Sequence, residues 1–133
     1  MEKAISFTSD KHRILQILIN LITNAKDAMV EAEVKDPVIT IEFDSDDESI
    51  LFRVRDNGIG IEQDKIDRIF QHGFTMKADG HGFGLHSSAN AATEIGGSLT
   101  ASSPGLGFGA VFELRLPRVK PKSLETSSKL SAV

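Results

Sequence analysis

Amide and carboxylate side chains recur on one face of a predicted helix. Asn20, Asn24, Asp27 and Glu31 follow one another at steps of four, three and four residues, nearly opposite the apolar stripe of the same segment. Such oxygens are hard ligands of the kind that Mg²⁺ accepts, usually beside several waters and a substrate phosphate. Considered alone, this pattern favours the solvated face of an amphipathic helix over a metal site.

A second candidate is segment 56–60 (DNGIG), at the end of a predicted strand. The carboxylate of Asp56 could accept a hydrogen bond from an exocyclic amine, and the neighbouring glycines would let a flat ring approach the backbone. A simple strand-ending turn explains these residues equally well, because Asp, Asn and Gly are the common turn residues.

A third candidate is segment 80–85 (GHGFGL), which opens another predicted helix. Glycines in this position expose backbone N–H groups, and the helix dipole favours an anion there. The segment follows a loop instead of a strand and lacks Gly-Lys-Ser/Thr, so it is neither a Rossmann fingerprint nor a P-loop. Simple loop flexibility remains the alternative.

The four histidines show no metal-ligand spacing, and we assign no catalytic role to them. His81 lies inside segment 80–85 and could donate to a phosphate. The others are expected to be surface or packing residues.

Hydrophobic periodicity predicts the elements that position these residues. Residues 4–7 alternate weakly, as in an edge strand, and a helix is expected from about Asp10, capped by Ser9 or Asp10. Its apolar face comprises Leu18, Leu21, Ile22, Ala25, Met29 and Ala32. Pro37 lies beyond its end.

The remaining chain predicts two hairpins and two more helices. In chain order they are strands 38–43 and 50–55 around the turn 44–49, a short helix over 62–70, a glycine-rich loop over 73–84, a helix over 85–95 stopped by Gly96-Gly97, and strands 98–102 and 110–116. This order predicts an α/β two-layer sandwich, with three helices on one face of a mixed sheet of about five strands.

Composition narrows the class of protein. The chain has 133 residues, of which 40% are hydrophobic, 26% are charged and none is cysteine. We therefore expect one globular domain over residues 1–117, without disulfides or thiolate metal sites. No run approaches the about 20 apolar residues of a membrane span, and no signal peptide is apparent.

Charge separates the body of the chain from its tail. The net charge is −4, to which residues 118–133 contribute +3 (four basic residues against one acid), leaving −7 for the body. An acidic body argues against nucleic-acid binding. The tail is rich in Ser and Lys and predicts a flexible basic linker.

Together, the three candidate segments occur in the order found in a known family. The chain resembles the ATP-binding catalytic domain of histidine kinases (the GHKL superfamily, with the Bergerat ATP-binding fold), which is related to gyrase-type topoisomerases, heat-shock chaperones and mismatch-repair ATPases. Segment 20–28 (NLITNAKDA) resembles the N box, 56–61 and 80–85 the two glycine boxes, and 69–75 the phenylalanine box. The likeness runs from about residue 5 to 117.

The resemblance implies ATP and Mg²⁺ as ligands, with Asn24 on the metal and Asn20 beside the phosphates. Asp56 would bind the adenine amine, and Gly60 would leave room for the ring. The residues implied in nucleotide binding are Asn20, Asn24, Asp27, Asp56, Gly58, Gly60, Ile61, Phe70, Thr75, Lys77, Gly80, His81, Gly82, Phe83, Gly84 and Leu85. Two positions depart from the commoner pattern: Asp27 stands where many sensor kinases have Lys or Arg, as in the subset resembling nitrogen-regulation kinases, and Gly109-Ala110 stands where Gly-Thr is common.

Asn20 distinguishes the branches of this family. In the ATP-hydrolysing relatives the matching residue is a glutamate that acts as general base, and a carboxamide cannot accept that proton. The resemblance therefore implies an ATP-dependent protein histidine kinase of a two-component system, with Asn20 and Asn24 as its catalytic residues. The acceptor histidine would lie on a separate helical hairpin, and a response regulator receiver domain would act downstream.

Several expectations accompany this interpretation. The isolated domain should be monomeric, without direct membrane contact, and cytoplasmic, either free or as the cytoplasmic part of a membrane-bound sensor. The alternatives are an anti-sigma-type serine kinase and a degenerate nucleotide-binding interaction module on the same fold.

Overall fold

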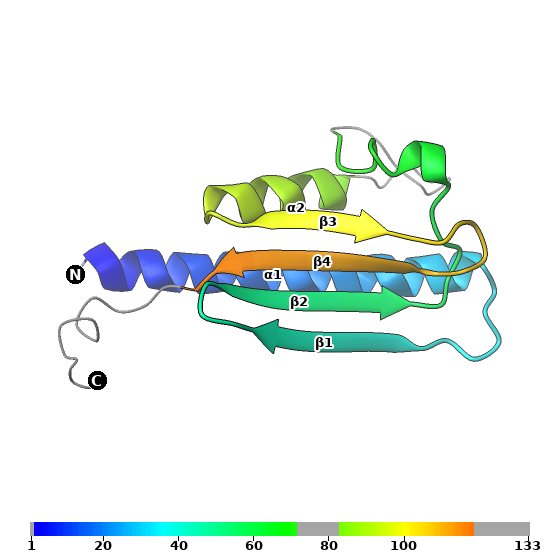
Figure 1. Cartoon of the computed structure of the whole chain (residues 1–133), viewed down its shortest axis with the longest axis horizontal. Coiled ribbons are helices and arrows are strands. Elements are labelled where there is room, and N and C mark those ends of the chain that lie inside the picture. The colour runs from blue at the N-terminus through cyan, green and yellow to red at the C-terminus, as the bar shows by residue number, and fades with distance from the viewer. Residues whose placement is uncertain (1, 72–82, 119–133) are drawn as a thin grey trace.

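A computed structural model describes residues 2–71 and 83–118 of the chain (Figure 1). The described elements are α1 (Glu2–Glu31), β1 (Ile39–Ser45), β2 (Ser49–Asp56), the short 3₁₀ helix η1 (Gln63–Lys65), α2 (Phe83–Glu94), β3 (Ser98–Ser102) and β4 (Ala110–Pro117). The four strands predicted from residue 38 onward and the predicted helix 85–95 agree with this assignment to within two residues at each end.

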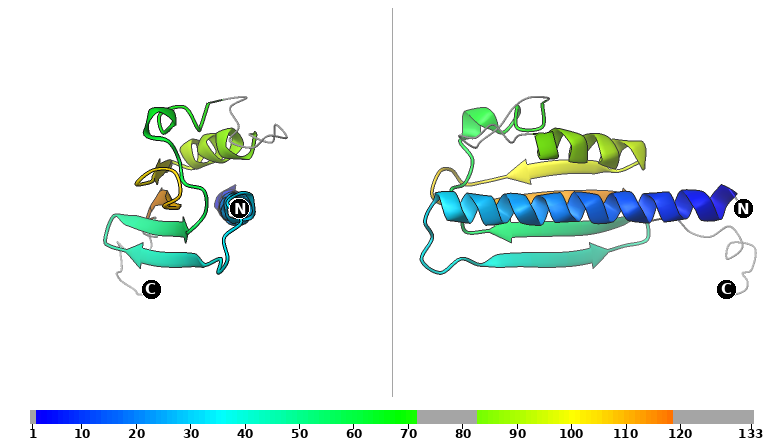
Figure 2. Two further views of the ribbon diagram at one scale, coloured as in Figure 1. Left: turned by 90° about the vertical axis from the view of Figure 1, so that its right-hand side faces the viewer. Right: turned by 180° about the vertical axis from the view of Figure 1, so that it is seen from behind.

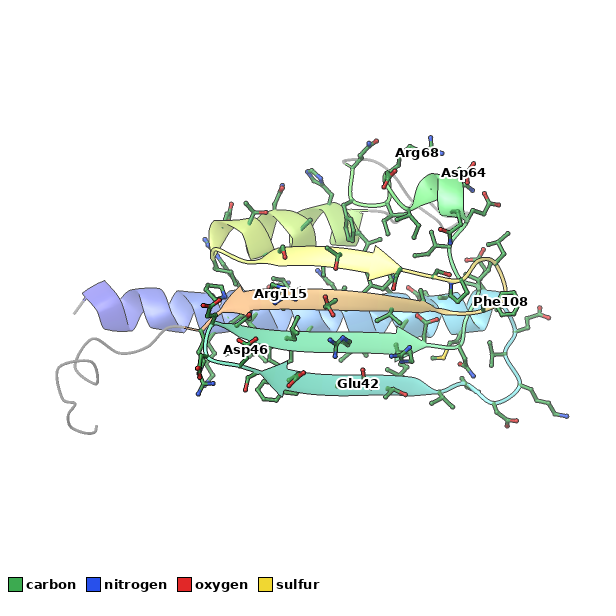
Figure 3. The ribbon with its side chains drawn as sticks, viewed as in Figure 1. Glu42, Asp46, Asp64, Arg68, Phe108 and Arg115 are labelled. Atoms are coloured by element: carbon green, nitrogen blue, oxygen red, sulfur yellow. The ribbon has the colours of Figure 1, made fainter. Side chains whose placement is uncertain are left out.

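The strands form one sheet in the order β1-β2-β4-β3, and each described neighbour pair is antiparallel. Both α-helices lie on the same face of this sheet (Figure 2). The opposite face carries polar side chains such as Glu42 and Arg115 (Figure 3). The predicted two-layer α/β sandwich is therefore confirmed.

The hydrophobic core lies between the sheet and the two helices. Strand registers place Val54 opposite Phe112 and Phe52 opposite Leu114, so their side chains share the helix-facing side. The fully buried core includes Ile17, Leu21, Ala25, Val54, Ile61, Ile69, Ala92, Phe112 and Leu114. Because α1 packs against β2 and α2 against β3, the helices are fixed relative to the strand ends.

Two predicted elements take a different form. Residues 4–7 are part of α1 and not an edge strand, so the described sheet has four antiparallel strands instead of about five in a mixed arrangement. A helix satisfies its backbone groups locally, whereas a short strand needs a sheet edge to pair with. Consequently Ser9 and Asp10 lie within α1 and not at its start.

The predicted helix over 62–70 is only a 3₁₀ turn followed by further turns. Its backbone bonds run from Lys65 N–H to the Glu62 carbonyl oxygen (2.9 Å) and from Arg68 N–H to the Lys65 carbonyl oxygen (2.9 Å), the i→i+3 pattern. The described part of the chain thus contains two α-helices instead of the three helices predicted.

The apolar face of α1 is shifted from the prediction. Leu21, Ala25 and Met29 are buried as expected, but Ile22 and Ala32 are exposed, and Ile17, which the prediction omitted, is fully buried. Buried residues recur every four positions, so the contact stripe slants across the helix. No helix in the described part of the chain is long and apolar enough to cross a membrane.

Candidate functional site

The amide-bearing edge of α1 borders its buried stripe instead of lying opposite to it. Asn20, Asn24 and Asp27 are half-buried, and Glu31 is exposed. The side chains that could hold phosphate or metal are therefore set beside the core, against neighbouring elements. This position corrects the expectation of a fully solvated face.

Asp56 ends β2 and is buried, with 5% of its surface exposed. Its Oδ1 atom accepts a hydrogen bond from the Gly58 N–H (2.8 Å). Its Oδ2 atom is buried and accepts no hydrogen bond from the described residues. A buried acceptor without a donor costs about 1–3 kcal/mol, so this oxygen is suited to a donor that a ligand brings.

Burial also perturbs the charge of this carboxyl. The pKa of Asp56 is raised above its ordinary value of 3.8, because burial disfavours the carboxylate more than the N–H groups of Gly58 and Ala110 stabilise it. A ligand N–H directed at Oδ2 would favour the charged form and lower the pKa again.

The segment after Asp56 packs closely against the last turns of α1. The Ile59 N–H donates to the Ala28 carbonyl oxygen (3.1 Å), and a Cβ placed on Gly58 would lie 2.7 Å from the Ala28 carbonyl carbon. Gly60 has a φ of 78°, which side chains rarely adopt, and a Cβ there would meet the Gly105 carbonyl oxygen. Contacts with neighbouring backbone atoms, and at Gly60 the positive φ, thus require glycine at both positions.

Ser103, which follows β3, holds this segment in place. The Ser103 hydroxyl accepts a hydrogen bond from the Ile61 N–H (3.1 Å) and donates to the Gly109 carbonyl oxygen (2.6 Å). The Gly109 N–H in turn donates to the Gly58 carbonyl oxygen (3.1 Å). The loop between β3 and β4 therefore holds residues 58–61 (the glycine segment) by hydrogen bonds, a contact between distant parts of the chain that no local pattern indicates.

The start of α2 lies against Asn20. A Cβ placed on Gly84 would lie 3.9 Å from Asn20 Cγ, and the Asn20 Nδ2 donates to the Ser88 hydroxyl (3.0 Å). The two helices enclose a groove of about 470 Å³, which is lined by Arg13, Gln16, Ile17, Asn20, Gly84, Ser87, Ser88 and Ala91. Asn20 and Gly84, predicted independently from distant segments, therefore share one groove.

Phe70 and His86 connect the segments on either side of residues 72–82. The Phe70 ring meets Phe112 edge-on with 6.2 Å between ring centroids. A ring nitrogen of His86, Nδ1, lies 3.0 Å from the Phe70 carbonyl oxygen and must be the donor, because a carbonyl only accepts. His86 is half-buried, in agreement with the expectation of a surface or packing residue.

Some predicted site residues cannot be placed. Thr75, Lys77, Gly80, His81 and Gly82 lie outside the described residues, as does the side chain of Phe83. Leu85 is buried in the core, with 7% exposed, so its side chain supports the helix instead of lining the site.

The edge of α1 aligns the described parts of the site. The start of α2 meets α1 at Asn20, the glycine segment meets it at Ala28, and Asn24 lies between them. Eight helical residues span about 12 Å, so the site is elongated, with the Asp56 acceptor toward one end and the Asn20 amide toward the other. Among residues 2–71 and 83–118, no three His, Cys, Asp or Glu side chains gather in a metal-binding cluster.

Residues 9–120 match the family described as histidine kinase-, DNA gyrase B- and HSP90-like ATPases. The chain belongs to this ATPase family. The match covers α1 from Ser9 onward and every other described element, including both glycine segments. ATP is the ligand of this family, and the elongated site agrees with it.

The chain is similar to curated sensor proteins, among them a sensor histidine kinase. The chain is 38% identical over 109 residues to the sensor protein FixL of Bradyrhizobium diazoefficiens. This alignment covers 82% of the chain and 21% of FixL. The chain is 37% identical over 110 residues to the sensor histidine kinase ZraS of Salmonella typhi (82% and 23%), and 34% identical over 110 residues to the sensor protein CitS of Halalkalibacterium halodurans (82% and 20%). The chain thus spans about a fifth of the length of these relatives and corresponds to their ATPase region.

Proposed function

We propose that this chain is the Mg-ATP-binding catalytic domain of a two-component sensor histidine kinase, which donates the γ-phosphoryl group to a histidine on a separate dimerisation domain. The observation that carries the proposal is the buried Oδ2 of Asp56, an acceptor without a donor among the described residues. The exocyclic amine of adenine is a donor of the right kind. Gly60 and Ile61 would lie beside the ring.

The phosphates would extend along α1 toward Asn20. Asn24 would supply a carboxamide oxygen to Mg²⁺, which, when bound, neutralises charge on the transferring phosphoryl group. Asn20 and the backbone at Gly84 would contact the phosphates, with Asp27 near the metal. Thr75, Lys77, Gly80, His81 and Gly82 would complete the phosphate side from the segment between Phe70 and α2.

Asn20 favours transfer to a protein over hydrolysis. A neutral carboxamide cannot take a proton from an attacking water, so the site offers position and charge neutralisation but no general base at this residue. The incoming histidine would attack the γ-phosphorus through a ring nitrogen as the bond to the ADP oxygen breaks. The similarity to the sensor proteins FixL and CitS and to the sensor histidine kinase ZraS supports a sensor-kinase role over a serine-kinase role.

Two kinds of partner follow from this proposal. One is a histidine-bearing helical hairpin, and the other is a response regulator receiver domain that takes the phosphoryl group from it. We also propose residues 1–117 as the catalytic domain and residues 118–133 as a basic linker.

Calorimetric titration of the purified chain with ADP and with a non-hydrolysable ATP analogue, with and without Mg²⁺, tests the nucleotide site. We expect binding of both ligands, strengthened by the metal for the triphosphate. Absence of binding by a folded chain would overturn the proposal.

Transfer is tested by mixing the chain and labelled ATP with a purified dimerisation domain of a sensor kinase relative. The expected product is an acid-labile, alkali-stable phosphoprotein that is lost when the acceptor histidine is replaced by glutamine. An acid-stable product would instead indicate a serine kinase.

A further inference from the structure

Ser88 is a polar residue inside the buried stripe of α2. It is 1% exposed and lies between Leu85 and Ala92, which are buried core residues on the same side of the helix. A buried hydroxyl destabilises a core unless it is hydrogen-bonded. A purely packing role would be filled better by alanine, so the contact that Ser88 makes is informative.

That contact joins two segments that are 68 residues apart in the sequence. The Asn20 Nδ2 donates to the Ser88 Oγ at 3.0 Å, and both residues line the groove between α1 and α2. The start of α2 lies beside the same carboxamide, since a Cβ on Gly84 would be 3.9 Å from Asn20 Cγ. Asn20 is therefore held from one side by Ser88 and confined by the start of α2.

A carboxamide on a half-buried helix position has a broad torsional range about its terminal bond. One N–H of the Asn20 amide is used by Ser88. The carbonyl oxygen and the second N–H are then available to the groove in a restricted set of orientations. A free amide would lose this orientational freedom when a ligand binds, and such ordering weakens affinity.

We propose that Ser88 is a positioning residue for the phosphate end of the site: its hydroxyl pre-orients the Asn20 carboxamide toward the β- and γ-phosphates. This inference rests on the proposed function, because the nucleotide phosphates are the groups that Asn20 would meet. Ser88 itself does not contact the phosphates; it acts through Asn20.

A bridge between the helices would have different consequences from a positioning contact. The Arg13–Glu94 ion pair (3.3 Å) is an example of a bridge farther along α1 and α2. Loss of a bridge would change the stability of the fold and affect every nucleotide alike. Loss of a positioning contact would affect only ligands that carry the distal phosphates.

The test compares Mg²⁺-bound AMPPNP, which has all three phosphates, with AMP, which lacks the distal two, using the 133-residue chain. Ser88→Ala should raise the Kd of AMPPNP about fivefold to tenfold, the range expected for one lost hydrogen bond, while the Kd of AMP stays unchanged. Ser88→Thr retains the hydroxyl and should restore AMPPNP binding to the wild-type level. Calorimetry measures the Kd of AMPPNP. The Kd of AMP, the weaker ligand, is measured from changes in backbone amide chemical shifts during an NMR titration.

Thr93→Ala is the matched control, because it removes a hydroxyl from the same helix whose hydrogen bond goes to the Ala89 carbonyl oxygen (3.1 Å). It should change neither Kd. In an Asn20→Ala background, Ser88→Ala should have no further effect on AMPPNP, since its action passes through that amide. This double-mutant cycle shows whether Ser88 acts through Asn20, even if the added methyl group in Ser88→Thr disturbs the core.

Three results with the variants would overturn the proposal. Ser88→Ala could weaken both ligands equally and lower the Tm, which would indicate a bridge. Ser88→Ala could leave the Kd of AMPPNP unchanged. It could also raise that Kd by the same factor in the Asn20→Ala background as in the wild type. Failure of the wild-type chain to bind either ligand would overturn the proposed function too, and it would be seen before any variant is made.

Discussion

At the scale of single residues, Asp56 carries the strongest argument for a nucleotide. Its two oxygens have different tasks: Oδ1 accepts the Gly58 N–H and shapes the turn, whereas Oδ2 is buried without a donor among the described residues. A residue needed only for the turn would not require the second oxygen. The burial that raises the pKa of Asp56 destabilises its carboxylate in the folded protein, and a ligand that donates a hydrogen bond to Oδ2 can offset this destabilisation.

Asp56→Asn separates the two tasks. The amide oxygen of asparagine can keep the Gly58 hydrogen bond, which places its NH₂ group where Oδ2 was, facing the adenine amine. Two donors then oppose each other, so we expect ADP affinity to fall at least about 100-fold, as for a site whose polar partner is mismatched. The Tm of the empty protein should stay level or rise, because a buried charge is removed. Calorimetry and thermal unfolding measure the two effects.

The pH dependence of the wild type should show two opposite trends. Because burial raises the pKa of Asp56, the folded state favours the protonated form, and stability falls as pH rises through that pKa. The adenine amine needs the carboxylate, so ADP affinity should rise over the same interval above pH 3.8. Calorimetric titration with ADP and urea unfolding measure the two trends at pH values between 4 and 7, in steps of ~0.5 pH unit. Asp56→Asn should remove both trends.

A separate carboxyl titrates outside that interval. The pKa of Asp46 is lowered by hydrogen bonds from the backbone N–H groups of Glu48 and Ser49. Its stabilising contribution is present above its ordinary pKa of 3.8 and is lost as pH falls below that value. Parallel rather than opposite trends above this pH would contradict the role given to Asp56.

At the scale of elements, α1 organises the site by meeting two separate segments along one edge. The glycine segment touches it at Ala28, and α2 begins beside Asn20. These contacts have different tolerances: a Cβ on Gly58 would lie 2.7 Å from the α1 backbone, whereas one on Gly84 would be at an ordinary distance of 3.9 Å from Asn20. The glycine segment is thus packed directly against the α1 backbone, whereas the start of α2 leaves room for a methyl group beside Asn20.

Gly58→Ala and Gly84→Ala should therefore change stability in opposite directions. We expect Gly58→Ala to lower the free energy of unfolding by about 1–3 kcal/mol, because the helix backbone must move away. Gly84→Ala should raise it by about 0.5–1 kcal/mol, since alanine favours the helical state. Urea unfolding of both variants measures the difference, and an equal loss in the two would show that the helix contact at Gly58 is not tight.

At the scale of the whole molecule, the core is concentrated under the helices and thins toward β1. Phe112 on β4 is 1% exposed, whereas Phe43 on β1 is 64% exposed although its ring lies 5.3 Å from that of Phe52. α1 covers β2 and touches β1 only at its margin. Stability and site geometry therefore depend on the β2–β4 centre of the sheet, where Asp56 and Ala110 are paired.

Phe112→Ala should lower the free energy of unfolding by about 3–5 kcal/mol, because it leaves a cavity beside Phe70 in the centre of the core. Phe43→Ala, at the exposed margin, should cost about 1 kcal/mol or less. Urea unfolding measures both, with ADP binding as a second readout: the Phe43 variant should bind normally. Similar losses in the two variants would contradict this distribution of the core.

The sequence determined the class of fold and most element positions. Alternating strands around short turns and a glycine pair after the helix are local signals, which explains why strand 98–102 was predicted to the residue and why the helix before Gly96 ended as expected. The order of the amide, Asp-Gly and glycine-rich segments also indicated the ATPase family to which the chain belongs. These features depend on neighbours in the chain.

Tertiary structure alone decided how those segments meet. Residues 4–7 are helical, although a strand was expected there. The sequence could not predict this, because no local pattern tells whether a neighbouring strand is available for pairing. The burial of Asp56 Oδ2, the Ser103 clamp on Ile61 and the bond from Asn20 to Ser88 each join residues distant in sequence or depend on packing from several elements. Hydrogen-bond partners and burial are set by the assembled core, so a sequence names the candidate residues while the fold decides which of them act together.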